Sequence, residues 1–263
     1  MTKIETDGFL SDEAINSKKY FVDKYVDLFD FAVELNRFSM DVMSSQKVDW
    51  EDKQKFILKT LHIRLIENYQ ATILLLQMGM ISQAKVLVRG MLESVFILVA
   101  LQKKPDLVQS YYDQFEEGRR RALKASCQFK GKELKQAAKE HELEKHYIEQ
   151  KKSLIDKELN SLRPKQWAIA AELEDFYNLW YTLYSNSAHS NLPALDDHID
   201  KTEKEINLAF GPTEKYLCET FQCCVYIMLN ANNSMAQCYS QDKKKELDAM
   251  YEKIKTIDEK YLS

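Results

Sequence analysis

The sequence has few of the residues that introduce turns into a chain. Its 263 residues include six glycines and four prolines. A β-sandwich or β-barrel needs many tight turns, so this scarcity excludes an all-β architecture, and it excludes collagen-like chains as well. The remaining composition, with 45% hydrophobic and 30% charged residues, is typical of a water-soluble helical protein. We therefore predict an all-α fold built as a single multi-helix bundle.

Long apolar runs and signature motifs are also missing. The most apolar stretch, residues 71–101, is interrupted by polar and charged side chains. Its longest uninterrupted run, Val95–Leu101, is far shorter than the roughly 20 residues that span a bilayer. The chain also lacks the glycine-rich phosphate loops, the H-E-x-x-H zinc motif and the G-x-S-x-G nucleophile turn. We expect no membrane association, no metal ion and no cofactor.

An excess of positive charge is absent too. With 37 basic and 41 acidic residues the net charge is −4, which disfavours general binding of duplex DNA and confines any nucleic-acid role to a local patch.

The five cysteines are odd in number and follow no zinc-ligand spacing. Together with the polar first residues, MTKIETDGF, they predict a cytoplasmic protein in a reducing compartment.

Helical periodicity runs through nearly the whole chain, and we expect one domain over residues 1–263. The core of this domain should comprise about residues 11–130 and 164–240. Between these parts, residues 131–160 hold seven lysines and seven acidic residues with few apolar ones, which predicts a charged helical excursion over about 131–163.

A C-terminal helix is expected over about 242–262. Its apolar residues form one narrow seam: Leu247, Met250, Ile254, Ile257 and Tyr261. Such a seam must be buried, either against the bundle or against the same helix of a second subunit. Because the other helices have broad apolar faces for one another, we favour a homodimer through this helix.

Polar residues occupy an unusual place on the most apolar helix, over about 82–102. Lys85, Arg89 and Glu93 follow one another at four-residue intervals and so share one side of that helix. This stripe is either a thin exposed edge with an Arg89–Glu93 pair or a buried network. A buried network would need partners from another helix, because an unpaired buried charge costs several kcal/mol.

A second polar group is expected at the end of the core helix that begins at Pro164. Tyr181, Ser185 and His189 share one side of this helix, and His189 is a group that exchanges protons near neutral pH. The alternative is simple capping, in which serine and asparagine side chains end the helix and His189 bonds a terminal carbonyl.

These two segments together resemble an uncharacterised, mostly bacterial helical family, the domain of unknown function 5677. The resemblance covers about Ile57 to Asn191 and is carried by Arg89…Glu93 and Ser185…His189-Ser190. It supports a site but implies no reaction, since the family has no assigned activity. A wider similarity is to HEPN-like helical bundles, many of which are metal-independent ribonucleases. Their Arg–His spacing within one helix is absent from this sequence.

We expect a polar pocket where these helices meet, acting on RNA or a nucleotide. In this hypothesis His189 is the general acid and base, Arg89 stabilises a phosphate, and Glu93 orients Arg89. The binding residues would be Lys85, Tyr181, Tyr184, Ser185, Ser190 and Asn191. The alternative function is a non-enzymatic interaction or scaffold protein, in which the same cluster is a buried structural network.

One basic segment is a further candidate for phosphate binding. It contains Arg119, Arg120, Arg121 and Lys124, and aromatic residues suited to base stacking precede it. Consecutive arginines point to different sides of a helix, so the alternative interpretation is an ordinary solvated surface.

Overall fold

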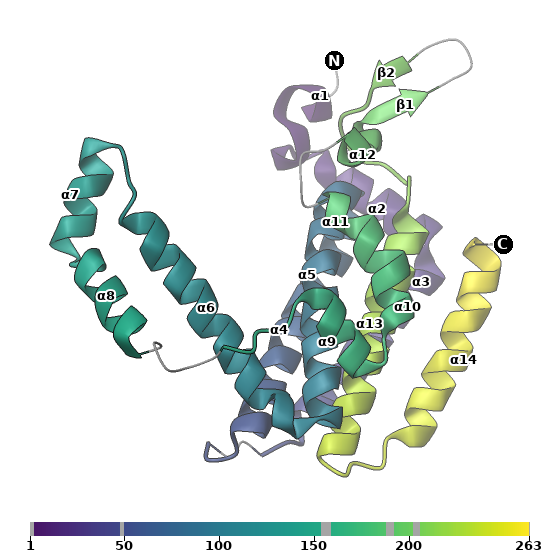
Figure 1. The fold of residues 1–263 in the computed structure, drawn as a ribbon. Helices are drawn as coiled ribbons and strands as arrows, with labels where there is room; N and C mark the ends of the chain where they lie inside the picture. Colours follow the sequence, from purple (N-terminus) through teal and green to yellow (C-terminus); the bar gives the residue numbers. More distant parts are fainter. Residues whose placement is uncertain (1–2, 48–49, 154–158, 188–191, 202–205, 263) are drawn as a thin grey trace.

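The computed structural model describes residues 3–47, 50–153, 159–187, 192–201 and 206–262. Helices make up most of these residues, which confirms the all-α prediction. The body is a bundle of five helices: α2 (Ala14–Lys24), α3 (Val26–Ser44), α4 (Lys53–Gln77), α5 (Ile81–Lys103) and α13 (Leu217–Cys238). Figure 1 shows α4, α5 and α13 at its centre.

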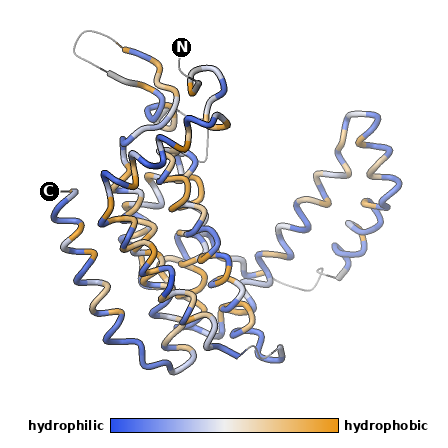
Figure 2. The backbone as a smooth tube through the Cα atoms, turned by 180° about the vertical axis from the view of Figure 1, so that it is seen from behind, coloured by the Kyte–Doolittle hydropathy of each residue, from blue (hydrophilic) through white to orange (hydrophobic). Residues whose placement is uncertain are grey.

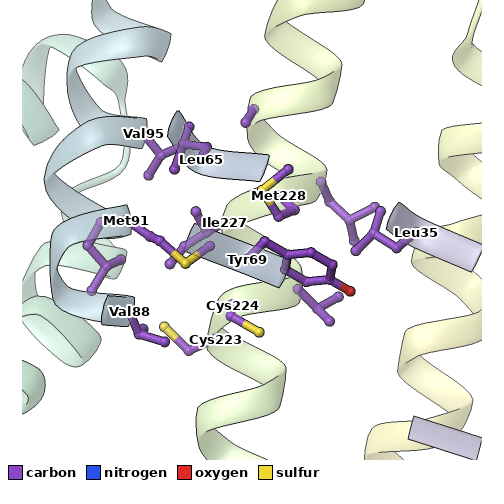
Figure 3. Packing of buried hydrophobic residues seen from close by; sticks show 14 of the residues in the cluster. Leu35, Leu65, Tyr69, Val88, Met91, Val95, Cys223, Cys224, Ile227 and Met228 are labelled. Atoms are coloured by element: carbon purple, nitrogen blue, oxygen red, sulfur yellow. The ribbon is translucent and has the colours of Figure 1, made fainter. Parts of the chain in front are cut away.

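The core lies where α4, α5 and α13 pack together, with α3 beside them. Figure 3 shows Leu65 of α4, Met91 of α5 and Ile227 of α13 meeting there, and none of the three is exposed to solvent. Cys224 lies in the same layer, and burial raises the pKa of its thiol. This cysteine therefore packs as a small apolar side chain.

A short irregular chain of helices covers one side of α5. It consists of α9 (Pro164–Ala171), α10 (Glu174–Phe176), the π-helical turn η3 (Tyr177–Tyr181) and α11 (Thr182–Ser187). The single long helix expected from Pro164 onward is thus interrupted. Glu172 adopts a left-handed backbone conformation with φ of 60°, which ends α9.

One end of the bundle carries several small elements, visible above the body in Figure 1. They are α1 (Lys3–Asp7), η1 (Gly8–Leu10), α12 (Leu192–Leu195), η4 (Asp196–His198), and the strands β1 (Ile199–Lys201) and β2 (Ile206–Leu208). The strands pair antiparallel, with Ile199 opposite Leu208. This hairpin was not expected from the sequence, because strands of three residues leave too short an alternating pattern to recognise.

The charged excursion is larger than predicted. After η2 (Pro105–Leu107), helix α6 (Val108–Ser126) leaves the body, and α7 (Lys132–Glu140) and α8 (Leu143–Ser153) fold back beside it. Figure 1 shows these three helices as a projecting arm, and Figure 2 shows how hydrophilic they are. The projecting arm therefore includes α6, which precedes residue 131, where the charged excursion was expected to begin. The base of α6 is anchored to the body, where Trp167 Nε1 donates a hydrogen bond of 2.9 Å to Gln114.

The C-terminal helix, α14 (Lys244–Tyr261), packs against α3 and α13 of the same chain. Its seam residues Leu247 and Ile254 are 4% and 0% exposed. Salt bridges from Lys253 to Glu34 and from Lys260 to Asp27 hold it along α3. The seam is already covered, so it offers no surface to a second copy, and the homodimer expected through this helix is not supported.

None of the helices in the described ranges combines the length and apolarity needed to cross a membrane.

Candidate functional site

Arg89 and Glu93 lie one helical turn apart on α5, and Tyr181 reaches them from η3. Arg89 Nη2 donates a hydrogen bond of 3.0 Å to the Tyr181 hydroxyl, which in turn donates one of 2.9 Å to Glu93 Oε1. Arg89 Nη2 and Glu93 Oε1 are 3.2 Å apart. The structure thus brings together three residues that the sequence placed in one site, and we call them the Arg89 cluster.

The Arg89 cluster is partly open to solvent. The side chains of Arg89 and Glu93 are 22% and 36% exposed, whereas Tyr181 is 8% exposed. Glu93 is therefore more accessible than a member of a buried network would be. The arrangement is neither a sealed core network nor an exposed pair without partners, because a buried tyrosine joins the two charges.

The π-helical turn η3 sets the position of Tyr181. A π turn inserts one extra residue into a helix, and such turns often occur at functional sites. Here Thr182 Oγ1 donates a hydrogen bond of 3.1 Å to the Tyr177 carbonyl, five residues back. The rings of Tyr177 and Tyr181 stack with centroids 4.9 Å apart, and Phe96 of α5 packs against both. This aromatic group leaves the Tyr181 hydroxyl pointing at α5.

Burial and the hydrogen bond to Glu93 raise the pKa of Tyr181 to about 12. The phenol is therefore protonated at neutral pH and acts as both donor and acceptor. The Arg89 guanidinium carbon lies 5.2 Å from the centre of the Tyr181 ring, within cation–π range. Arg89 Nε is buried and has no hydrogen-bond partner in the described part of the chain. The Arg89 guanidinium is thus fixed in position by Tyr181 and Glu93, and a cation fixed in this way can bind an oxyanion.

Lys85 belongs to a separate cluster, although it shares the helical stripe of Arg89. Its ammonium lies 2.5 Å from Asp197 Oδ1 of η4 and 4.0 Å from the centre of the Tyr216 ring. Ser82 Oγ donates a hydrogen bond of 2.9 Å to the other oxygen of Asp197. The charge of Lys85 is neutralised in this buried group, so the structure does not place it in the Arg89 cluster.

The structure does not place the other residues predicted for this site in the Arg89 cluster. Tyr184 is 1% exposed, and its hydroxyl donates a hydrogen bond of 3.4 Å to the Glu219 carbonyl. Burial raises its pKa well above the ordinary value, and the residue packs in the core instead of lining a pocket. Ser185 is half-buried on α11. The other predicted residues, His189, Ser190 and Asn191, lie outside the described residues.

The four basic residues Arg119, Arg120, Arg121 and Lys124 are exposed on α6, in the projecting arm. Arg121 forms a salt bridge with Glu117 of the same helix. Figure 1 shows the arm directed away from α5 and α11, so these residues are not part of the Arg89 cluster.

A buried polar chain in the core was not recognised in the sequence. His62 Nε2 of α4 is 2.9 Å from Asn232 Oδ1 of α13, and Asn232 Nδ2 donates a hydrogen bond of 2.8 Å to Ser39 Oγ of α3. Burial lowers the pKa of His62 to about 4, so the imidazole is neutral. The only sequence signal is a histidine on the apolar face of α4, among Leu58, Leu61 and Leu65.

Among the residues with described positions, no group of three or more His, Cys, Asp and Glu side chains is arranged to hold a metal ion.

A protein-family model described as "Family of unknown function (DUF5677)" matches residues 55–206. No curated protein and no solved structure matches the chain. The matched range runs from α4 to the first residue of β2, so it includes both the Arg89 cluster and the arm.

Proposed function

The chain belongs to the Family of unknown function (DUF5677), and from its own residues we propose that it binds RNA or a nucleotide and acts on the phosphodiester without a metal ion. The observation that carries this proposal is the Arg89 guanidinium, held by Glu93 and Tyr181 and still partly exposed. A preorganised cation of this kind stabilises the charge that develops on phosphate oxygens in the transition state.

The proposed reaction is an internal transesterification of RNA, which needs no external nucleophile. A general base removes the proton of the ribose 2′-hydroxyl, and the 2′-oxygen forms a bond to phosphorus. The bond from phosphorus to the 5′-oxygen breaks, and that oxygen accepts a proton from a general acid. The products are a 2′,3′-cyclic phosphate and a free 5′-hydroxyl.

In this scheme Arg89 binds the phosphate, and Glu93 and Tyr181 are positioning residues. His189, which lies outside the described residues, is the general acid and base proposed from the sequence. The relationship to HEPN-like bundles belongs to the same proposal. We propose the cytoplasm as the compartment, and the five free cysteines support that assignment.

The second candidate function is a non-enzymatic interaction or scaffold protein. The observation that favours it is the 3.2 Å contact between Arg89 and Glu93, which neutralises the cation inside the cluster. A cluster whose charges satisfy one another would serve to fix η3 against α5. The two functions differ in what loss of Arg89 does: an enzyme loses turnover, whereas a scaffold loses stability.

Turnover of a labelled single-stranded RNA in the presence of a metal chelator tests the proposal. His189→Ala and Arg89→Gln should each lower turnover by about 100-fold or more, because general acid–base and oxyanion contributions are of that size. His198→Gln, exposed on η4 and outside the Arg89 cluster, is the matched control and should keep full activity. An inactive parent protein, with an Arg89→Gln variant that melts several degrees lower, would instead establish the scaffold function.

A further inference from the structure

Charge is distributed very unevenly between the outer part of the arm and the rest of the chain. Residues 118–153 contain eleven Lys and Arg but five Asp and Glu, so this segment is net +6. The whole chain, with 37 basic and 41 acidic residues, is net −4, which leaves the remainder at −10. The tip half of α6, together with α7 and α8, is therefore a positive region on a negative protein.

Most of these cations have no acidic partner among the described residues. Within the described part of the arm, Arg121 pairs with Glu117 and Lys145 pairs with Glu142. For the other nine, no described residue places a carboxylate within salt-bridge distance: Arg119, Arg120, Lys124, Lys130, Lys132, Lys135, Lys139, Lys151 and Lys152. Like charges gathered in this way repel one another, and a bound polyanion removes the repulsion.

The arm also encloses a hollow of about 830 Å³ between the end of α6 and helices α7 and α8. Four lysines line it: Lys135, Lys139, Lys145 and Lys152. Three glutamates line it as well, Glu142, Glu144 and Glu149, of which Glu142 is already paired with Lys145. Phe129 and Ile148 supply apolar surface.

Exposed aromatic rings lie on α6 before the basic residues. Phe115 is 65% exposed and Tyr112 is 37% exposed. A large apolar ring in water costs free energy unless something covers it, and the bases of a single strand stack on such rings. In a duplex the bases are already stacked on one another, so these rings favour a single strand.

From these observations we infer that the arm of α6, α7 and α8 binds the phosphate backbone of a single-stranded polynucleotide. The substrate of the Arg89 cluster is then an RNA chain and not a free nucleotide. The choice of RNA over DNA rests on the proposed function, because the proposed reaction uses the 2′-hydroxyl. The 19 residues of α6 span about 28 Å, which is far longer than one nucleotide.

Fluorescence anisotropy with a labelled polyuridine RNA of about 20 nucleotides measures this interaction directly. One variant combines Arg119→Gln, Arg120→Gln and Lys124→Gln on α6. A second combines Lys135→Gln, Lys139→Gln and Lys152→Gln in the hollow. Each should weaken binding by about tenfold and reduce the slope of log affinity against log salt by about 2, since each lost phosphate contact on a single strand contributes roughly 0.7.

The matched control removes the same charge from the body, by Lys19→Gln, Lys244→Gln and Lys245→Gln. These lysines are exposed, and none has an acidic partner among the described residues. The control should change affinity by less than about twofold. An equal loss in the control and the arm variants overturns the inference, because net charge alone would then explain binding.

Binding of other nucleic-acid ligands, compared with binding of the RNA, tests whether the partner is a single-stranded RNA chain. Uridine monophosphate should bind at least about 100-fold more weakly than the RNA, and duplex DNA should compete poorly. Mononucleotide binding as tight as RNA binding, or tighter binding of the duplex, overturns the inference. Single-stranded DNA of equal length that binds as tightly as RNA overturns the choice of RNA.

The two proposals fail in different ways. Arg89→Gln should lower turnover by about 100-fold or more, while weakening binding in the anisotropy titration much less than the arm variants do. Arm variants that bind and cleave RNA like the parent contradict the role of the arm but leave the Arg89 cluster as an active site. Arm variants that lose binding, in a protein that never cleaves RNA, support the arm and contradict the proposed reaction.

Discussion

Lys85 and Asp197 form an ion pair of 2.5 Å although their side chains are only 9% and 7% exposed. Both oxygens of the carboxylate are satisfied, one by Lys85 and the other by Ser82. The Tyr216 ring covers the ammonium. This pair joins α5 to η4 and so fixes the segment from which the hairpin of β1 and β2 extends.

Removing one partner of this pair should be much more harmful than removing both. Asp197→Ala leaves the Lys85 ammonium buried without a partner and should lower the free energy of unfolding by about 3–5 kcal/mol. Lys85→Met combined with Asp197→Leu replaces the pair by apolar side chains and should recover most of that loss. Denaturant titrations of the three proteins measure the difference.

The neighbouring residue provides the control for this experiment. Asp196 pairs with Lys215, but those side chains are 40% and 36% exposed. Asp196→Ala should therefore cost about 1 kcal/mol or less, as expected for an exposed pair. Equal costs for Asp196→Ala and Asp197→Ala would contradict the importance of burial.

The buried His62 predicts a loss of stability in mild acid. Its pKa is lowered from 6.5 to about 4 in the folded chain, mainly by burial. Between these pH values the unfolded chain binds a proton that the folded chain does not, so the free energy of unfolding falls as the pH drops from 6.5 towards 4. The full effect is about 3 kcal/mol.

Denaturant unfolding at several pH values between about 4 and 7 tests this prediction. His62→Gln keeps a donor for Asn232 but cannot titrate, and it should lose most of the pH dependence in this window. His146→Gln, an exposed histidine on α8, should behave like the parent. A His62→Gln protein with the parent's pH dependence would assign acid sensitivity to other groups.

The sequence predicted the helices well because their apolar periodicity is long and regular. It also predicted that the segment of Tyr181 meets Arg89 and Glu93, because charges on so apolar a helix need partners from elsewhere. The sequence did not indicate that Lys85 and Arg89 belong to different clusters. Both lie on one side of α5, but they are about 6 Å apart along the helix axis. Over that distance the element that packs against α5 changes from η4 to η3.

Two features had no signal that a single sequence can provide. The π-helical turn at Tyr181 depends on one inserted residue within a segment too short to show a change of period. The His62–Asn232 hydrogen bond joins residues 170 positions apart, and no local pattern indicates which polar residues on two apolar helices will meet. The start of the arm has no clear sequence signal either, because the base of α6 packs on Trp167 and resembles a core helix, whereas its second half does not.

The covered seam of α14 predicts how the C-terminal helix responds to substitution. Ile254 is fully buried between α14 and the bundle, so Ile254→Ala leaves a cavity and should lower the free energy of unfolding by about 2–5 kcal/mol. Ile254→Asp should be worse, because it also buries a carboxylate. Lys245→Ala, on the exposed side of the same helix, should change stability by less than about 0.5 kcal/mol. Thermal and denaturant unfolding measure these costs, and light scattering on the same samples measures the mass. A drop in mass from dimer to monomer on Ile254→Asp, without any loss of stability, would contradict the intramolecular packing of this helix.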